Sequence, residues 1–191
     1  MSKAPAAMSR LSDEKLMRLV ANLDAAAFEV LYDRHAAAVY GLCHRMAPSA
    51  AMADDMCQEA FLSVWRSSGR YNPKLGAVRS WMLSITHNRA IDQIRRSRRH
   101  DDRQIQDDAL AEQMPSRDST DAEALGQIDA DDTGRALRTL PDEQRAVIEL
   151  SFYSGYSHAE IADKLDIPFG TVKGRMRLGL EKLQGQLSKA A

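Results

Sequence analysis

The sequence predicts an all-α protein made of two small helical domains joined by an acidic, flexible linker. Apolar residues recur at intervals of three and four along most of the 191 residues, which is the spacing of one helix face. Helix-capping residues precede these segments, and Gly or Pro follows several of them. No segment shows the alternation of β-branched and polar residues that is typical of a half-buried strand.

The N-terminal domain is predicted to span residues 11–99, after a disordered tail at 1–10 that is rich in Ala, Ser and Pro. Ser12 is expected to cap a short helix that continues to about Ala21, and Asp24 to cap the long helix that follows. The predicted apolar face of the short helix consists of Leu16, Leu19, Val20 and Leu23.

Two further helices complete this domain. One is predicted to begin at Ala51 and to be closed by Gly69, a residue type that commonly ends a helix. Asn-Pro and Gly over residues 70–76 predict a loop. The next helix is expected from about Ser80 to about Arg99, with an apolar first half and a strongly basic second half.

Charge is unevenly distributed, although the formal net charge is only −1. Residues 1–99 carry 15 Lys and Arg against 9 Asp and Glu, and residues 134–191 carry 9 against 7. Residues 100–133 carry 2 against 11 and few large apolar residues, which predicts the acidic linker. The near-neutral total therefore conceals two basic-leaning ends, as expected of a nucleic-acid-binding protein.

The C-terminal domain, residues 134–191, has two short breaks between three apolar-periodic segments. After the first break, Ser157 and Glu160 stand three residues apart, which is the spacing of a capping box. The second break ends at Gly170, and Thr171 is expected to cap the last helix. The predicted inward stripe of that helix consists of Val172, Met176, Leu180, Leu183 and Leu187.

Three basic residues, Lys173, Arg175 and Arg177, lie off this stripe near the start of the last helix. A short helix, a tight turn and a second helix with basic N-terminal residues form the helix-turn-helix arrangement, whose second helix enters the major groove of DNA. The same pattern also fits an ordinary helical hairpin with a solvated basic face. The spacing by itself leaves both interpretations open.

The residues of this region also resemble a known family. They resemble the promoter-binding C-terminal domain of bacterial sigma factors, most closely that of the extracytoplasmic-function (ECF) group. Four segments carry the resemblance: Leu140-Pro141, Gln144-Arg145, Ala159-Glu160-Ile161-Ala162 and Gly170-Thr171-Val172-Lys173. Gly174 departs from the pattern, because many relatives carry Ser there. The change is expected to remove a phosphate contact and to weaken the helix by roughly 1 kcal/mol relative to Ala.

The resemblance implies that the last helix reads the −35 element of a promoter and that the preceding helix supports it. The implied DNA-contacting residues are Thr171, Val172, Lys173, Gly174, Arg175 and Arg177. The implied supporting residues are Ser157, His158, Glu160, Ile161, Ala162 and Leu165.

The resemblance covers nearly the whole chain apart from its tail. Residues 53–65 are similar to the helix with which the family docks on the β′ coiled coil of RNA polymerase, and the polymerase β flap is a further expected contact. The implied docking residues are Asp54, Asp55, Gln58, Glu59, Phe61, Leu62 and Trp65. Taken alone, these residues fit better an aromatic core with a solvated acidic face; beside the C-terminal resemblance, docking against basic helices is favoured.

The loop and the basic helix resemble the family's −10 element, which reads and melts promoter DNA. An opened strand requires cations for its phosphates and a pocket for a flipped base. The implied residues are Tyr71, Asn72, Lys74, Arg79, Asn88, Arg89, Asp92, Arg95 and Arg96. Three alternatives stay open: the arginines as a solvated helix end, Asp92 paired with a neighbouring Arg, and Trp81 as a core residue.

The acidic linker resembles the connector that threads the polymerase channels in this family, although an inert tether fits it equally well. No catalytic set or phosphate loop is present, so we predict no enzyme activity, no small-molecule substrate, no cofactor and no metal, with the polymerase supplying the chemistry. Cys43 and Cys57 are expected to pack as small apolar residues in a reducing cytoplasm. No apolar run approaches the roughly 20 residues of a membrane span.

The sequence also bears on the control of this protein and on two rival functions. No N-terminal inhibitory extension is evident, which favours control by an anti-sigma factor. A polymerase-independent homodimeric helix-turn-helix regulator would bind palindromic half-sites, but it leaves residues 53–65 and the basic helix without a role. A recombinase-type enzyme would need a nucleophile motif, which the sequence does not provide.

Overall fold

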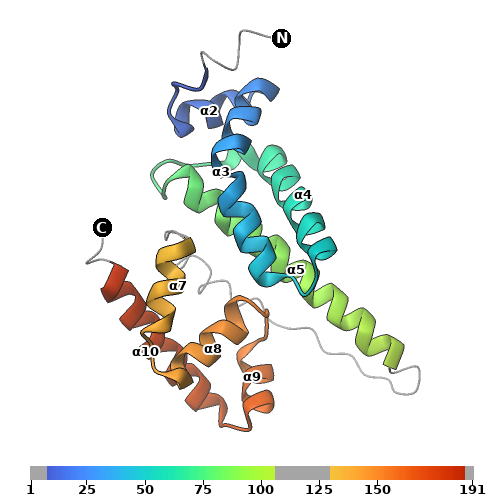
Figure 1. Ribbon diagram of the computed structural model, residues 1–191, viewed down its shortest axis with the longest axis vertical. Coiled ribbons are helices and arrows are strands. Elements are labelled where there is room, and N and C mark those ends of the chain that lie inside the picture. The colour runs from blue at the N-terminus through green and yellow to red at the C-terminus, as the bar shows by residue number, and fades with distance from the viewer. Residues whose placement is uncertain (1–7, 106–129, 188–191) are drawn as a thin grey trace. The chain divides into compact units, whose positions relative to one another are not determined.

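The computed structural model describes residues 8–105 and 130–187, and the regular elements of these residues are all helices (Figure 1). The predicted all-α class is therefore confirmed. The chain forms two compact units, with their boundary between Ala90 and Ile91. Within the described ranges, no helix has both the length and the apolar character needed to cross a bilayer.

The first unit contains α2 (Asp13–Val20), α3 (Ala25–Met46), α4 (Ala50–Ser67), the 3₁₀ turn η1 (Ser68–Arg70) and the beginning of α5 (Val78–Ile105). Helices α3 and α4 pack side by side, and α2 packs on both α3 and η1 (Figure 1). The core residues are almost completely removed from water, and the largest of them are Leu16, Met17, Leu31, Met56 and Met82.

Side-chain caps set the starts of two helices. The Asp24 carboxylate accepts a hydrogen bond from the Ala27 N–H at 3.0 Å, as predicted. The Ser49 hydroxyl accepts one from the Met52 N–H at 3.3 Å, so α4 begins one residue earlier than expected. Ser12 holds the N-cap position of α2, but its side chain makes no capping hydrogen bond.

The predicted apolar face of α2 is wrong at Leu23, which is 72% exposed. The turn between α2 and α3 places Leu23 at a φ of 66°, a conformation that directs its side chain away from the core. Leu16 and Val20 are buried as predicted, and Met17 joins them.

The helices that flank the predicted linker are longer than expected. α5 continues to Ile105 instead of ending near Arg99, and α7 (Ala130–Arg138) begins before Gly134. Residues 100–105 contain neither Gly nor Pro, so nothing in the local sequence ends α5 at its arginines. The remaining linker residues, 106–129, and tail residues 1–7 lie outside the described residues.

In the second unit, α7 is followed by α8 (Asp142–Phe152), α9 (His158–Leu165) and α10 (Phe169–Leu187). α10 packs on the other three helices (Figure 1). The core is formed mainly by Leu137, Leu140, Val147, Ile148, Ile161, Val172, Met176 and Leu183. The predicted stripe of α10 is thus buried at three of its positions, and Leu180 packs against it half-buried.

Gly179 allows the closest approach between α8 and α10. A Cβ atom at this position would lie 2.6 Å from Cδ1 of the buried Ile148 and 3.4 Å from Cβ of Gln144. Real side-chain carbons do not approach to 2.6 Å, so Ile148 occupies space that any other residue at 179 would need. The glycine therefore fixes how deeply α10 sits against α8.

Candidate nucleic-acid interface

The start of α9 has the predicted capping box. The Ser157 hydroxyl accepts a hydrogen bond from the Glu160 N–H at 3.3 Å, and the Glu160 carboxylate accepts one from the Ser157 N–H at 2.6 Å. Partial burial opposes ionisation of Glu160, but these contacts with the main chain and hydroxyl of Ser157 outweigh it and lower the pKa of the carboxyl below its ordinary 4.5. The box fixes the entry of the chain into α9.

The helix-turn-helix support residues divide between cap and core. Ile161 and Ala162 are buried, and Leu165 packs half-buried against the same core. His158 is half-buried, with its ring centroid 6.4 Å from that of Phe169. Ala159, which the spacing places on the apolar face, is instead exposed, and Ile161, Ala162 and Leu165 form the core side of this short helix.

The turn into α10 differs from the prediction at its cap. Asp166 takes a left-handed conformation, with φ of 51°, and ends α9. α10 begins at Phe169, directly after Pro168, whose carbonyl accepts hydrogen bonds from the Thr171 N–H at 2.8 Å and the Val172 N–H at 3.2 Å. Thr171 therefore lies inside the first turn of α10 and is not its N-cap.

The three basic side chains of α10 have different partners. Arg175 forms an ion pair with Glu143 of α8, with Nη2 and Oε2 2.8 Å apart, and its side chain is only 26% exposed. Arg177 pairs with Glu181 one turn along the helix, at 2.7 Å. Lys173 is exposed and places its Nζ 5.1 Å from the centre of the Phe169 ring.

The other predicted contact residues of α10 present little side chain to solvent. Val172 is fully buried, as its place in the inward stripe requires, so it anchors the helix. Gly170 and Gly174 lie one turn apart, and, apart from their chain neighbours and the nearby backbone of α10 itself, no heavy atom comes within 4 Å of where a Cβ would stand at either. In the described part of this unit, the space beside these two glycines is therefore open.

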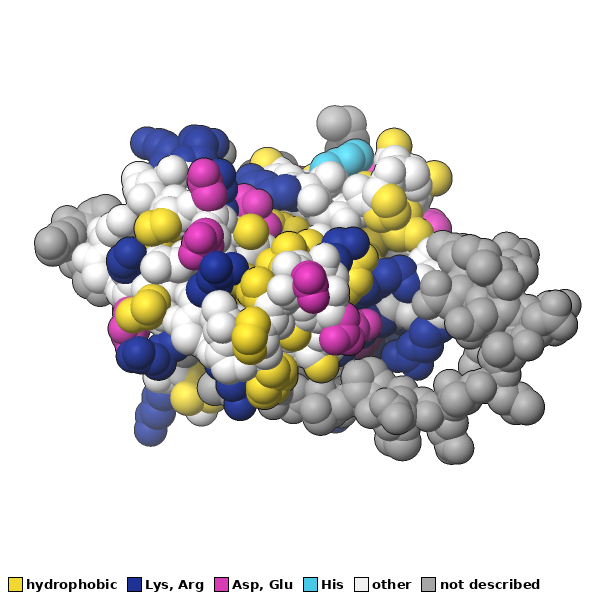
Figure 2. All heavy atoms as spheres, turned by 90° about the horizontal axis from the view of Figure 1, so that it is seen from below, with side chains coloured by type: hydrophobic (Ala, Val, Ile, Leu, Met, Phe, Trp, Pro, Cys, Tyr) yellow, Lys and Arg dark blue, Asp and Glu magenta, His cyan; other side chains and the backbone are white. Residues whose placement is uncertain are grey.

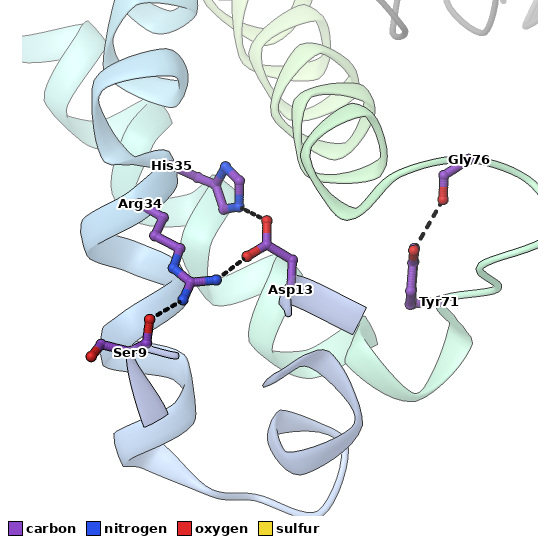
Figure 3. Close-up of polar contacts among 6 residues, drawn as sticks. All are labelled: Ser9, Asp13, Arg34, His35, Tyr71 and Gly76. Atoms are coloured by element: carbon purple, nitrogen blue, oxygen red, sulfur yellow. Dashed lines mark hydrogen bonds and ion pairs between the residues drawn. The ribbon is translucent and has the colours of Figure 1, made fainter. Parts of the chain in front are cut away.

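The loop before α5 is held closed by its own side chains (Figure 3). The Tyr71 hydroxyl donates to the carbonyl of Gly76 across 3.0 Å, and the Asn72 side chain accepts from the Lys74 N–H at 3.0 Å. The Trp81 ring lies 5.6 Å from that of Tyr71 in an edge-on contact, which agrees with a packing role for Trp81. Leu75 lies in this loop and is 79% exposed, which the sequence did not predict.

A polar cluster ties helix α2 to α3 (Figure 3). The Asp13 carboxylate contacts Arg34 Nη1 at 2.5 Å and His35 Nε2 at 2.6 Å, and Arg34 also donates to the carbonyl of Ser9 at 2.8 Å. Burial, followed by the nearby carboxylates of Glu14 and Asp13, raises the pKa of the Tyr71 hydroxyl. Tyr71 therefore stays protonated and available as a donor to its loop.

The polar residues of α5 line its exposed side. Asn88, Arg89, Asp92 and Arg96 are exposed, whereas Arg79 and Arg95 are half-buried. Arg96 Nε donates to the main-chain carbonyl of Asp92 at 3.2 Å, so the contact between these two residues involves the backbone of Asp92.

The predicted docking residues of α4 separate into two groups. Asp54, Asp55, Gln58 and Leu62 are exposed, and Glu59 is half-buried. Phe61 is buried and Trp65 is half-buried, and both belong to an aromatic cluster with α3. The ring centroids of Phe28 and Trp65 are 5.2 Å apart, and those of Tyr32 and Phe61 are 4.5 Å apart. The two aromatic residues therefore hold α4 on α3, and the acidic and amide side chains face outward.

Both cysteines are buried, as expected, on facing helices α3 and α4. Burial raises the pKa of the Cys43 thiol, and it is also the largest cause of the raised pKa of Cys57.

Within residues 8–105 and 130–187, no group of three or more potential metal ligands comes together. Figure 2 shows a surface on which apolar, basic and acidic side chains are interspersed.

Two family profiles match the chain. Sigma-70 region 2 matches residues 31–100, and Sigma-70, region 4 matches residues 131–183. The ECF RNA polymerase sigma factor SigK of Mycolicibacterium vanbaalenii is 35% identical over 181 residues, which cover 93% of this chain and 90% of the relative. The protein of the same name in Mycobacterium tuberculosis is 32% identical over 180 residues, or 93% and 96% of the two chains.

Among solved structures, one similar chain is Rhodobacter sphaeroides SigE in complex with the anti-sigma ChrR. It is 28% identical, with a TM-score of 0.44, over 93% of this chain and 98% of the other.

Proposed function

The chain belongs to the extracytoplasmic-function group of the sigma-70 family, and we propose how its helices divide the work of such a factor. A sigma factor binds core RNA polymerase and directs it to promoters. The proposed division assigns the −35 element to α10, the −10 element to the 71–77 loop and α5, and the polymerase to α4. We assign no chemical step to this chain, because the polymerase performs the synthesis.

The carrying observation is the start of α10. A capped α9 and a tight turn lead into α10, whose first turns combine the side-chain-free backbone of Gly170 and Gly174 with a solvent-facing Lys173. This arrangement fits a helix that enters the major groove. Arg175 and Arg177 stand on the same two turns and add cations for phosphates or base edges.

For the −10 element, the closed loop and the exposed polar side of α5 supply complementary parts. Asn72 and Lys74 face solvent on a loop that Tyr71 holds in shape, which suits a pocket for a flipped base. Asn88, Arg89 and Arg96 continue as an exposed polar row along α5 and are proposed to follow the strand that leaves this pocket.

For the polymerase, the outward face of α4 offers Asp54, Asp55 and Gln58 beside the exposed Leu62. Charge reversal by Asp55→Arg is expected to weaken binding to core polymerase at least several-fold, because carboxylates steer docking onto a basic surface. Asp33→Arg, an equal reversal on the exposed face of α3, is the matched control. Binding measured by fluorescence anisotropy should fall for Asp55→Arg alone; equal binding by both variants would place the docking surface elsewhere.

We also propose control by an anti-sigma factor, in keeping with the sequence expectation of regulation in trans. A co-purified protein that blocks transcription by the reconstituted holoenzyme would support it, whereas activity that follows only the amount of this chain would count against it. Family membership does not favour the homodimeric regulator. Protection of palindromic DNA by the isolated chain would be needed to revive it.

A further inference from the structure

Large apolar side chains are exposed at two places on α10. Phe169, the first residue of the helix, is 48% exposed, and Leu178 is 42% exposed. Phe169 stands three residues before Val172, so it is in line with the buried stripe, yet it is not a member of the core beneath it. A phenylalanine at the tip of a helix that is proposed to enter DNA therefore has an uncommitted ring surface.

The ring is held by polar neighbours and not by a hydrophobic pocket. The Lys173 ammonium lies 5.1 Å from its centre, and the His158 ring lies 6.4 Å away in a tilted arrangement. The adjacent Gly170 adds no side chain that would cover it. These contacts restrict the ring before any partner binds, which lowers the entropy lost on binding, and they leave an apolar surface beside a cation.

In the major groove, the C5 methyl group of thymine is the apolar feature of the base edges, and Phe is among the side chains that contact it. A lysine next to such a contact meets a phosphate or a guanine edge. A protein partner would instead require a contiguous apolar patch, whereas Phe169 adjoins Pro168 along the chain and is otherwise flanked by a cation, an imidazole and a glycine. The chemistry around the ring thus favours a base edge.

We propose that Phe169 is a specificity residue that reads one thymine of the −35 element through its C5 methyl group. This inference rests on the proposed assignment of α10 to that element. Phe169 is not among the DNA-contacting residues that the resemblance implies. If it reads a thymine, the −35 element contains a thymine at the position facing the tip of α10.

The test replaces thymine by deoxyuridine, which keeps every hydrogen-bonding group and removes only the methyl group. Holoenzyme made from core polymerase and the full chain is bound to its mapped promoter, with each −35 thymine replaced in turn. One replacement should weaken wild-type binding about fourfold, as expected for one buried methyl group. Phe169→Ala should lose this sensitivity at that position and bind both duplexes equally.

Leu178→Ala is the matched control, because it removes an exposed apolar side chain further along α10 and should keep the fourfold effect. Phe169→Leu, which retains an apolar surface, should keep part of it. A wild-type holoenzyme insensitive to every replacement, or a Phe169→Ala variant that retains the full effect, would overturn the inference. A wild-type chain that supports no promoter-specific transcription would overturn the proposed function itself, and this inference with it.

Discussion

Two glycines on the same helix provide a matched test of how α10 packs. Replacing Gly by Ala in a helix interior stabilises the helix by roughly 0.5–1 kcal/mol through helix propensity and unfolded-state entropy, wherever the methyl group fits. At Gly174 no atom lies within 4 Å of the new Cβ, so Gly174→Ala should deliver that gain. At Gly179 the new Cβ would stand 2.6 Å from Ile148 Cδ1.

The propensity gain is shared by both variants, so their difference isolates the clash. Overpacking a buried site costs about 1–3 kcal/mol, and Ile148 is 1% exposed, which leaves its terminal carbon no solvent into which it can move. Gly179→Ala should therefore be less stable than Gly174→Ala by about 1–3 kcal/mol. It should also be no more stable than the wild type.

Hydrogen exchange of the full chain, followed by mass spectrometry, measures this locally. Exchange of α8 and α10 amides should slow roughly two- to fivefold in Gly174→Ala and should be unchanged or faster in Gly179→Ala, since tenfold in rate corresponds to about 1.4 kcal/mol. Peptides from α3 and α4 serve as the internal control. Equal slowing in both variants would refute the close approach of α10 to α8.

Three further predictions concern ionisable groups. Because the pKa of Glu160 is lowered, the stabilising contribution of its carboxylate is present above pH 4.5 and is lost as the pH falls through the folded-state pKa. The difference in stability between wild type and Glu160→Gln, measured by thermal melts, should therefore shrink below pH 4.5. A constant difference would contradict the capping role of the carboxylate. Burial raises the pKa of Cys43 and Cys57, so both thiols should react with a disulfide reagent at pH 8 far more slowly in the native protein than in urea. Rapid labelling of the native protein would instead show that the α3–α4 contact opens. Arg175→Ala should weaken promoter binding. The loss should be about 1–3 kcal/mol at one base pair if the guanidinium reads a base, or the salt dependence of binding should fall by about one unit of slope if it meets a phosphate. Glu143→Gln, which releases Arg175 and removes a nearby negative charge, should tighten binding, and no change in either variant would exclude Arg175 from the interface.

The sequence was sufficient for features set by local chemistry. The capping box of Ser157 and Glu160 and the cap of Asp24 depend on residues three positions apart, so their spacing alone predicts them. The buried stripe of α10 follows from helical periodicity in the same way. The α-helical class followed from the same periodicity and from the capping residues, together with the absence of strand patterns.

Features set by contacts between distant residues could not be predicted. Nothing in the sequence around Arg175 indicates that Glu143 would be its partner, because the pair forms only when α8 packs on α10. The polar cluster of Asp13 with Arg34 and His35 likewise forms only when α2 packs on α3.

Exposed apolar residues escaped detection for a different reason. Periodicity assigns an apolar side chain to the core, but the core has to extend far enough to receive it. Phe169 continues the stripe of α10 but lies outside the core, and Leu23 is turned outward by a left-handed backbone. A large apolar residue beside Pro168 or at a predicted turn is the signal that would have marked such positions.

The central claim is that this chain selects promoters for RNA polymerase, and reconstituted transcription tests it most directly. Core polymerase with the full chain would be supplied with a genomic promoter library, and the transcription start sites would be mapped. The account predicts starts preceded by two shared elements at a fixed spacing, because two linked domains each read one of them. Transcription without shared elements, or none beyond that of core polymerase alone, would contradict it.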